Sequence, residues 1–244
     1  MTDFNIGMFA QAGDDLGARI SEFDGSINSP YAAKAQARVY AVRDVLRAAH
    51  NSAENYDPSV SGDANYMNAV DKVDKSVTLA DTYNKELDAI NSEWLLDLTR
   101  QENIACGFDR TSGDTKGIED AFCAKPLTEK LQDLMNRWQK NPAKGGMYIG
   151  TVARMDEYRS GVSPEDVQRA RDMFVSIHAP HIAQQRGSKA KIMETARTAM
   201  GLPARVKNAF VDPVRAAAFR NRKAKFTASE RDFLAALAKR PDAA

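Results

Sequence analysis

Residues 64–106 contain neither Gly nor Pro, and this uninterrupted stretch constrains the fold more than any other feature of the sequence. Its apolar residues recur every three, four or seven positions, which is the spacing of one face of an α-helix. A helix of this length extends roughly 60 Å, because each residue adds about 1.5 Å. We therefore expect a long helix that packs on a second one through Tyr66, Val70, Val73, Val77, Ala80, Leu87, Trp94 and Leu98.

Two asparagines, Asn84 and Asn91, lie on the same heptad track as these apolar residues. An Asn at a packed position lowers stability but favours a single register between two helices. The sequence therefore predicts that both side chains lie in the contact between the helices.

A second helix is predicted at 29–50, before the long one. Ser29 is a suitable N-cap, and Pro30 occupies the first helical position, where a missing N–H costs nothing. Steps of four and three separate its apolar residues, which predicts a packing seam formed by Ala35, Val39, Val42, Leu46 and Ala49. Because the turn-rich segment 55–63 joins the two helices, we expect them to form an antiparallel hairpin.

The remaining segments with helical periodicity are shorter and lie after the long helix. They are 126–141, with Leu127, Leu131, Leu134 and Trp138, then 163–179, 188–200, a piece after Pro203, and 227–240. Thr227 and Glu230 have the spacing of a capping box, with Phe226 as its hydrophobic staple, so we expect the last helix to begin there.

The predicted fold class is all-α, with a long helical hairpin or bundle in the N-terminal half and a smaller basic helical region in the C-terminal half. We predict an acidic helical bundle at 1–140, whose long helix covers about 64–105. Pro142, Gly145, Gly146 and Gly150 break the helical pattern, so 141–162 is interpreted as a hinge. The basic helical region then covers 163–244.

The two cysteines, Cys106 and Cys123, bracket a loop rich in Gly, Asp and Thr. A disulfide between them would close a loop of 16 intervening residues and add about 3 kcal/mol of stability. The first residues of the chain lack the features of a secretory signal, and thiols stay reduced in the cytosol. Free thiols and a disulfide are therefore both open at this stage.

The net charge of +1 hides an uneven distribution. Residues 1–125 hold 12 Lys and Arg against 21 Asp and Glu, a net charge of −9, whereas residues 126–244 hold 22 against 12, a net charge of +10. The densest basic stretch is 186–225, in which Glu194 and Asp212 are the only acidic residues. Its cations are Arg186, Lys189, Lys191, Arg197, Arg205, Lys207, Arg215, Arg220, Arg222, Lys223 and Lys225.

These eleven cations have two interpretations. They form a surface that binds a polyanion or an acidic protein partner, in which case each phosphate contact would steepen the salt dependence of binding. Alternatively, they are the solvated face of an Ala-rich helical region. Motifs of sequence-specific nucleic-acid binding do not accompany them, so nucleic acid would be contacted through its backbone, without sequence specificity.

No motif of an active site stands out in the sequence. A nucleophile elbow and a phosphate-binding loop are missing, and His178 and His181 lack the further ligands that a metal site needs. We therefore assign no catalytic residue, no metal ligand and no cofactor. Enzymatic activity is not expected, and an active site would have to be assembled from residues scattered along the sequence.

The sequence favours a non-enzymatic structural or interaction protein that self-associates through its helical seams. Its partners would be further copies of the chain or another helical protein, and nucleic acid or an acidic surface for the basic region. A component of a virion, of a nucleoprotein particle or of a transport apparatus fits this description. An effector or toxin-like protein with a basic delivery signal at its C-terminus is the alternative. Without a signal or a membrane span in the sequence, we expect a cytoplasmic protein or one packaged from the cytoplasm.

Overall fold

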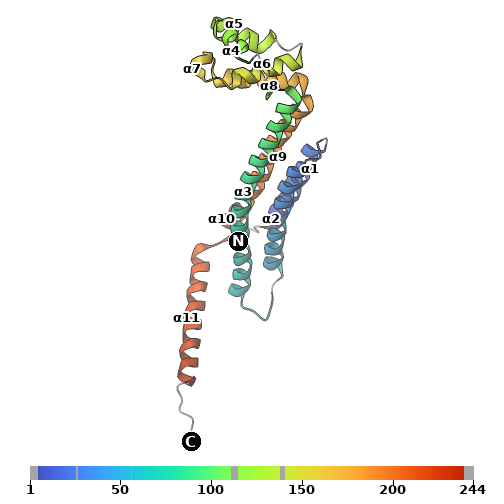
Figure 1. The fold of residues 1–244 in the computed structure, drawn as a ribbon. Helices are drawn as coiled ribbons and strands as arrows, with labels where there is room; N and C mark the ends of the chain where they lie inside the picture. Colours follow the sequence, from blue (N-terminus) through green and yellow to red (C-terminus); the bar gives the residue numbers. More distant parts are fainter. Residues whose placement is uncertain (1–4, 26, 56, 111–114, 138–140, 239–244) are drawn as a thin grey trace. The chain divides into compact units, whose positions relative to one another are not determined.

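The computed structural model describes residues 5–25, 27–55, 57–110, 115–137 and 141–238. Within these ranges every regular element is helical, which confirms the predicted all-α class (Figure 1). The elements are α1 (Gly7–Asp24), α2 (Pro30–Glu54), α3 (Gly62–Cys106), α4 (Thr115–Cys123), α5 (Leu127–Gln132), a π-helical turn η1 (Asp133–Arg137), α6 (Pro142–Ala153), α7 (Glu157–Ser160), α8 (Pro164–His178), α9 (Pro180–Met200), α10 (Leu202–Phe210) and α11 (Pro213–Ala238).

The helices form two compact units, and each unit combines segments that are distant in the sequence. The first unit consists of Met1–Glu22, Ala32–Asp88 and Met193–Ala244, and the second of Phe23–Tyr31 and Ala89–Ile192. Helices α3 and α9 contribute residues to both units. Residues 141–162, where the sequence predicts a hinge, contain α6 and α7 of the second unit, and the hinge itself stays a prediction.

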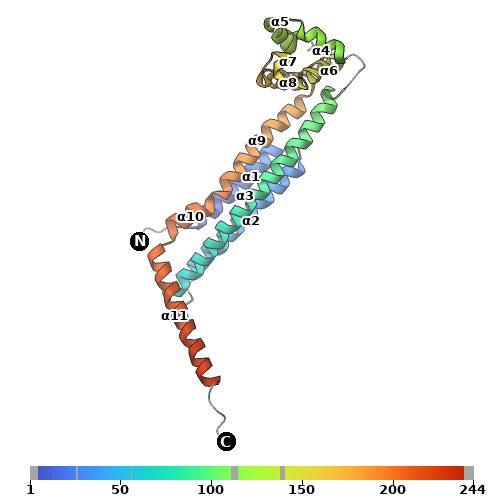
Figure 2. The same ribbon diagram turned by 60° about the vertical axis from the view of Figure 1, so that its left-hand side comes forward.

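The predicted hairpin of α2 and α3 is present in the first unit, where both views show the two helices side by side (Figures 1 and 2). The five seam residues predicted on α2 are all buried. On α3, buried side chains also follow the predicted track, and they include Val70, Val73, Ala80, Leu87, Trp94 and Leu98. The prediction for Asn84 is wrong, because its side chain is exposed to solvent, and Asn91 is only half-buried.

Helix α1 was not expected from the sequence, because its glycines obscure the helical pattern. Gly13 and Gly17 are buried in this helix, on the face that meets α2. A Cβ atom on Gly17 would lie 2.2 Å from a ring carbon of Tyr40, so only a residue without a side chain permits this approach. Gln36 secures the contact by donating its side-chain N–H to the Gly17 carbonyl at 2.8 Å.

The second unit has a core of aromatic side chains. Phe108 lies against Phe174 with ring centroids 5.8 Å apart, and Phe122 meets the edge of Tyr148 at the same distance. The buried Lys130 ammonium donates to the Ser160 carbonyl at 2.9 Å, which satisfies a charge that would otherwise be costly to bury.

Gly146 and Gly150 of α6 have a packing role in this unit. They lie four residues apart, on one face of the helix, and that face rests directly on the backbone at the end of α3. A Cβ atom would lie 1.6 Å from the Cys106 carbonyl oxygen at Gly146, and 2.0 Å from the Phe108 carbonyl oxygen at Gly150. Gly146 and Gly150, which lie in the predicted hinge, therefore let a helix approach another segment closely.

Several helix ends differ from those expected. The segment predicted as one helix at 126–141 is α5 followed by η1, Leu127 in it is exposed, and Trp138 lies outside the described residues. Helix α9 begins at Pro180 rather than at residue 188. The beginning of α8 matches the expectation, since the Ser163 hydroxyl accepts a hydrogen bond from the Asp166 N–H at 3.1 Å.

Candidate functional site

Among the described residues, at least six of the eleven predicted cations pair with carboxylates of the same chain. In the first unit the acidic partners include Asp63, Asp71, Asp74 and Asp88, all on α3, and in the second unit Glu102 and Asp172. The uneven charge of the sequence is therefore partly neutralised inside the folded chain. The cations concerned are Arg186, Arg197, Lys207, Arg215, Arg220 and Arg222.

The other five cations lie on α9, α10 and α11. Lys191 lies over the ring of Phe23, 5.6 Å from its centroid, and Lys189 is partly buried. Arg205, Lys223 and Lys225 are exposed and have no acidic partner among the described residues. The surface available to a polyanion is thus smaller than the eleven charges suggested.

Apolar contacts attach the beginning of α11 to the beginning of α3. Ala216 is buried against Met67 and Val70, and Phe219 covers the same cluster from one side. Tyr66 of α3 closes it, because its ring lies 5.5 Å from that of Phe210 and its hydroxyl accepts a hydrogen bond from the Asp212 N–H at 2.7 Å.

Ion pairs surround this apolar cluster. The Asp63 carboxylate, in the first turn of α3, forms ion pairs with the guanidinium groups of Arg215 and Arg222, with N–O distances of 3.0 Å and 3.2 Å. The Asp74 carboxylate, about three turns further along α3, forms ion pairs with Lys207 and Arg220, each with an N–O distance of 2.9 Å. Burial acts to raise the pKa of Asp74, but the hydrogen bonds and charges of Lys207 and Arg220 outweigh it, so its pKa lies below the usual value.

Replacing Asp74 with Asn is expected to loosen the attachment of α10 and α11. The loss should be no more than about 1 kcal/mol, because pairs this exposed are weak. Amide hydrogen exchange across 213–222 should quicken, whereas Asp81→Asn, an exposed change on the same helix, should leave it unchanged. Since the pKa of Asp74 is lowered, its contribution is present above the ordinary value of 3.8 and is lost as the pH falls through the lowered value. Equal exchange rates in both variants would contradict the role of these pairs.

The second half of α11 has a different environment. Every residue from Lys223 to Ala235 is exposed, including Phe226 at 69%, Phe233 at 62% and Leu234 at 59%. The two views show this part of the helix apart from the other helices of its unit (Figures 1 and 2). The predicted helix start at Thr227 is wrong, since α11 continues through it and the Thr227 hydroxyl donates to the Lys223 carbonyl one turn earlier.

A groove of about 580 Å³ lies between the first turns of α3 and the middle of α11. Met67, Phe219 and Phe226 are its large apolar lining residues, and charged side chains also line it. The full set is Ser61, Asp63, Ala64, Met67, Asn68, Asp71, Phe219, Arg222, Lys223 and Phe226. The groove extends from the attached part of α11, at Phe219, to its exposed part, at Phe226, because both side chains line it.

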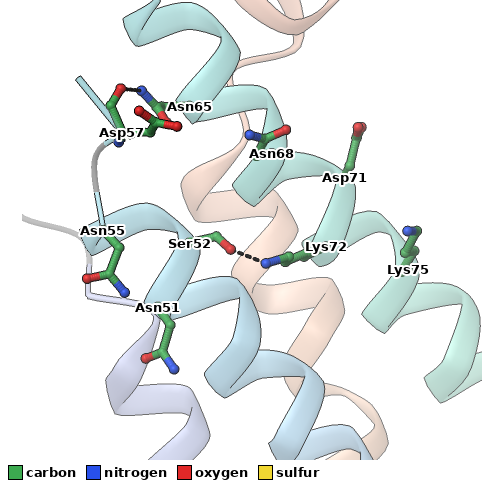
Figure 3. A pocket seen from close by; sticks show the side chains of 9 residues that line it. All are labelled: Asn51, Ser52, Asn55, Asp57, Asn65, Asn68, Asp71, Lys72 and Lys75. Carbon is green, nitrogen blue, oxygen red and sulfur yellow. Dashed lines mark hydrogen bonds between the residues drawn. The ribbon is translucent and has the colours of Figure 1, made fainter. Parts of the chain in front are cut away.

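A second, more polar pocket of about 510 Å³ lies between the end of α2 and the beginning of α3 (Figure 3). Its lining is Asn51, Ser52, Asn55, Asp57, Asn65, Asn68, Asp71, Lys72 and Lys75. The charges of its two lysines and two aspartates sum to zero. The Asn65 side-chain amide donates a hydrogen bond to the Asp57 carbonyl at 2.9 Å. Lys72 donates to the Ser52 hydroxyl, but both residues remain partly exposed, whereas a catalytic Lys that activates a hydroxyl is desolvated. We assign this contact to the packing of α2 on α3.

Both cysteines are free thiols in the structure. Cys106 is buried at the end of α3, and burial, together with the charge of Glu102, raises the pKa of its thiol to about 11. Cys123 is half-buried and donates to the Arg159 carbonyl at 3.3 Å. A thiol with so high a pKa is a weak nucleophile at neutral pH, so Cys106 contributes to packing.

The described residues contain neither a metal-binding cluster nor a membrane-spanning helix. No group of three or more His, Cys, Asp and Glu side chains there is arranged to hold a metal ion. Among the same residues, no helix combines the length and the apolar character that crossing a membrane requires.

Sequence reasoning did not find the exposed stripe on α11, although the sequence contains a signal for it. Phe219, Phe226 and Phe233 are spaced by seven residues and so share one face of a continuous helix. Placing a helix start at Thr227 divided this series between two elements. The acidic partners on α3 were missed for another reason, since only the folded chain brings residues about 150 positions apart into contact.

Comparison with known proteins gives no assignment. No protein family, no curated protein and no solved structure matches this chain. Its function is therefore inferred from its own contacts, burial and charges.

Proposed function

We propose that this chain is a non-enzymatic interaction protein, and that α11 is the helix through which it binds another helical protein. The observation that carries the proposal is the continuous exposure of residues 223–235 in a helix whose beginning is anchored to α3. Phe226, Phe233 and Leu234 are exposed together in this stretch, and clustered apolar side chains of this kind mark interaction sites.

The stability of an isolated helix supports the same proposal. Helices shorter than roughly 12–15 residues are marginal in water without tertiary contacts. The exposed part of α11 is of that length and receives little support from its own unit. A partner that covers its apolar face would both stabilise the helix and remove the phenylalanines from water.

Binding to a polyanion is less well supported. Arg220 and Arg222 already pair with aspartates of α3, and a phosphate would compete with these carboxylates for them. Lys223 and Lys225 remain available, but they stand beside exposed phenylalanines on the same helix. An apolar surface edged by cations fits a protein surface that is itself apolar with acidic edges.

Photo-crosslinking inside cells that produce the protein tests this proposal. A photoreactive phenylalanine analogue at position 226 or 233 is expected to form adducts with protein, which mass spectrometry then identifies. The same analogue in place of Asn208, exposed on α10, serves as the matched control and should give no adduct. Adducts with nucleic acid, or none at positions 226 and 233, would show that α11 does not bind a protein. A steep fall of nucleic-acid affinity with salt, reduced by Lys223→Ala, would then favour polyanion binding.

A further inference from the structure

We propose that the partner of α11 is the α11 of a second copy of this chain, and that the two helices pack antiparallel. This inference rests on the proposed function of α11 and names its partner. It follows from the continuity of an existing contact, from the charges on the helix and from the size of the surface.

The exposed stripe continues a contact that is already formed within one chain. Phe219 packs beside Met67, and Phe226 and Phe233 follow it at seven-residue intervals on the same face of α11. Arg222 meets Asp63 in the first turn of α3, so the stripe runs past the point where α3 begins. Beyond that point, among the described residues, no helix of its own unit covers Phe226 and Phe233, which are exposed.

The seven-residue spacing suits a second helix with the same spacing. Two α11 helices related by a twofold axis near Ser229 and Glu230 bring Phe226 of one copy next to Phe233 of the other. Such an interface is isologous, because each copy offers the same stripe to its partner. The groove beside Phe226 lies next to this contact, so the partner helix covers it as well.

The charges on α11 decide between the two orientations. Lys223 and Lys225, near its middle, are its exposed cations without an acidic partner among the described residues, since Arg220 and Arg222 pair with aspartates of α3, and Arg231 lies between Glu230 and Asp232. A parallel pair would place the two cationic clusters side by side. In the antiparallel pair, Lys223 of the two copies would be separated by about 20 Å, since 13 residues at about 1.5 Å lie between the paired positions. That separation exceeds the screening length of about 10 Å at 0.1 M salt, so the repulsion is avoided.

The size of the surface predicts reversible association. The exposed parts of Phe226, at 69%, and Phe233, at 62%, supply roughly 260 Å² per copy, given about 200 Å² for a whole aromatic side chain. Stable interfaces bury about 800 Å² per partner, so this one is at the small end even when the groove is included. We expect a dimer that dissociates in the micromolar range.

Sedimentation velocity on the full chain, from about 1 to 200 µM, tests the association. The wild type is expected to shift from monomer to dimer with concentration and to keep this behaviour at 1 M salt, because apolar contacts are not screened. Phe226→Ser combined with Phe233→Ser should abolish the shift. Val214→Ser is the matched control, since Val214 is exposed at 77% on α11 but points away from the stripe, and it should leave the dimer intact.

Disulfide trapping tests the orientation in a Cys123→Ser background. Ser229→Cys should form dimers on mild oxidation, because position 229 lies near the twofold axis, whereas Lys223→Cys should not. Equal trapping at both positions would overturn the antiparallel arrangement, and a wild type that remains monomeric would overturn the second copy as partner. If photo-crosslinks from position 226 then identify a different protein, the proposed function stands without this inference. If position 226 gives no protein adduct either, both fail.

Discussion

Replacing Gly146 with Ala is expected to lower the free energy of unfolding of the second unit by about 3 kcal/mol, at the upper end of the usual cost of overpacking. The new Cβ atom would lie 1.6 Å from the Cys106 carbonyl oxygen, which is a backbone atom. A flexible side chain can turn aside, but here α6 or the end of α3 must move. Gly150→Ala meets the Phe108 carbonyl oxygen in the same way, at 2.0 Å.

Gly187→Ala is the matched control for this prediction. Gly187 is also helical, in α9, but a Cβ atom there would have no neighbour within 4 Å. Ala is the better helix former, so this change should raise stability by about 0.5–1 kcal/mol. Urea unfolding followed by circular dichroism measures both effects. If Gly146→Ala proved as stable as the wild type, the direct contact between α6 and the end of α3 would be wrong.

Replacing Arg186 with Ala is expected to cost about 3 kcal/mol, because it leaves a buried carboxylate without its main partner. Glu102 is only 1% exposed and accepts a hydrogen bond from Arg186 at 2.5 Å, while the same guanidinium donates to Asp172 at 2.8 Å. Arg197→Ala, a change on the same helix, removes only a surface pair with Asp88. That control should cost less than about 1 kcal/mol.

The effect of Arg186→Ala should depend on pH. Burial raises the pKa of Glu102 above the ordinary value of 4.5, against the opposing charges of Arg186 and Arg171. The folded state therefore binds the proton of this carboxyl more tightly than the unfolded state does. Stability from this group is fully present below 4.5 and is lost as the pH rises through the raised pKa.

Without Arg186, the pKa of Glu102 should rise further, so the variant should regain stability as the pH is lowered toward 5. Adding Glu102→Gln to Arg186→Ala should likewise recover part of the loss at neutral pH, since a neutral amide needs no cation. Urea unfolding at a series of pH values measures both. A cost independent of pH and unrelieved by Glu102→Gln would mean that Arg186 acts through packing alone.

Arg186 also shows what a basic stretch in a sequence does and does not reveal. Charge counting places it among the eleven cations of a polyanion-binding surface, and nothing in the sequence separates it from Lys223. In the fold, Arg186 joins α9 to buried Glu102 and to α8, whereas Lys223 stands in solvent on α11. The difference lies mainly in Glu102, 84 positions away from Arg186, a contact that local patterns do not contain.

The glycines of α6 illustrate the same limit. Gly and Pro between two periodic segments usually mark a turn, and that interpretation produced the predicted hinge at 141–162. A Gly pair four residues apart is equally suited to one face of a closely packed helix. Only the segment opposite, here the backbone around Cys106, shows that this pair permits close packing, and whether 141–162 is also a hinge stays a prediction.

The sequence by itself determined the helical class, the hairpin of α2 and α3 and most of the apolar residues of its seam. These features depend on which residues share one face of a helix, and that information is periodic and local. The tertiary structure alone decided which cations are neutralised, which glycines permit close packing and where the apolar stripe of α11 loses its support. Each of these depends on contacts between residues far apart in the chain, and such contacts exist only after the helices have packed.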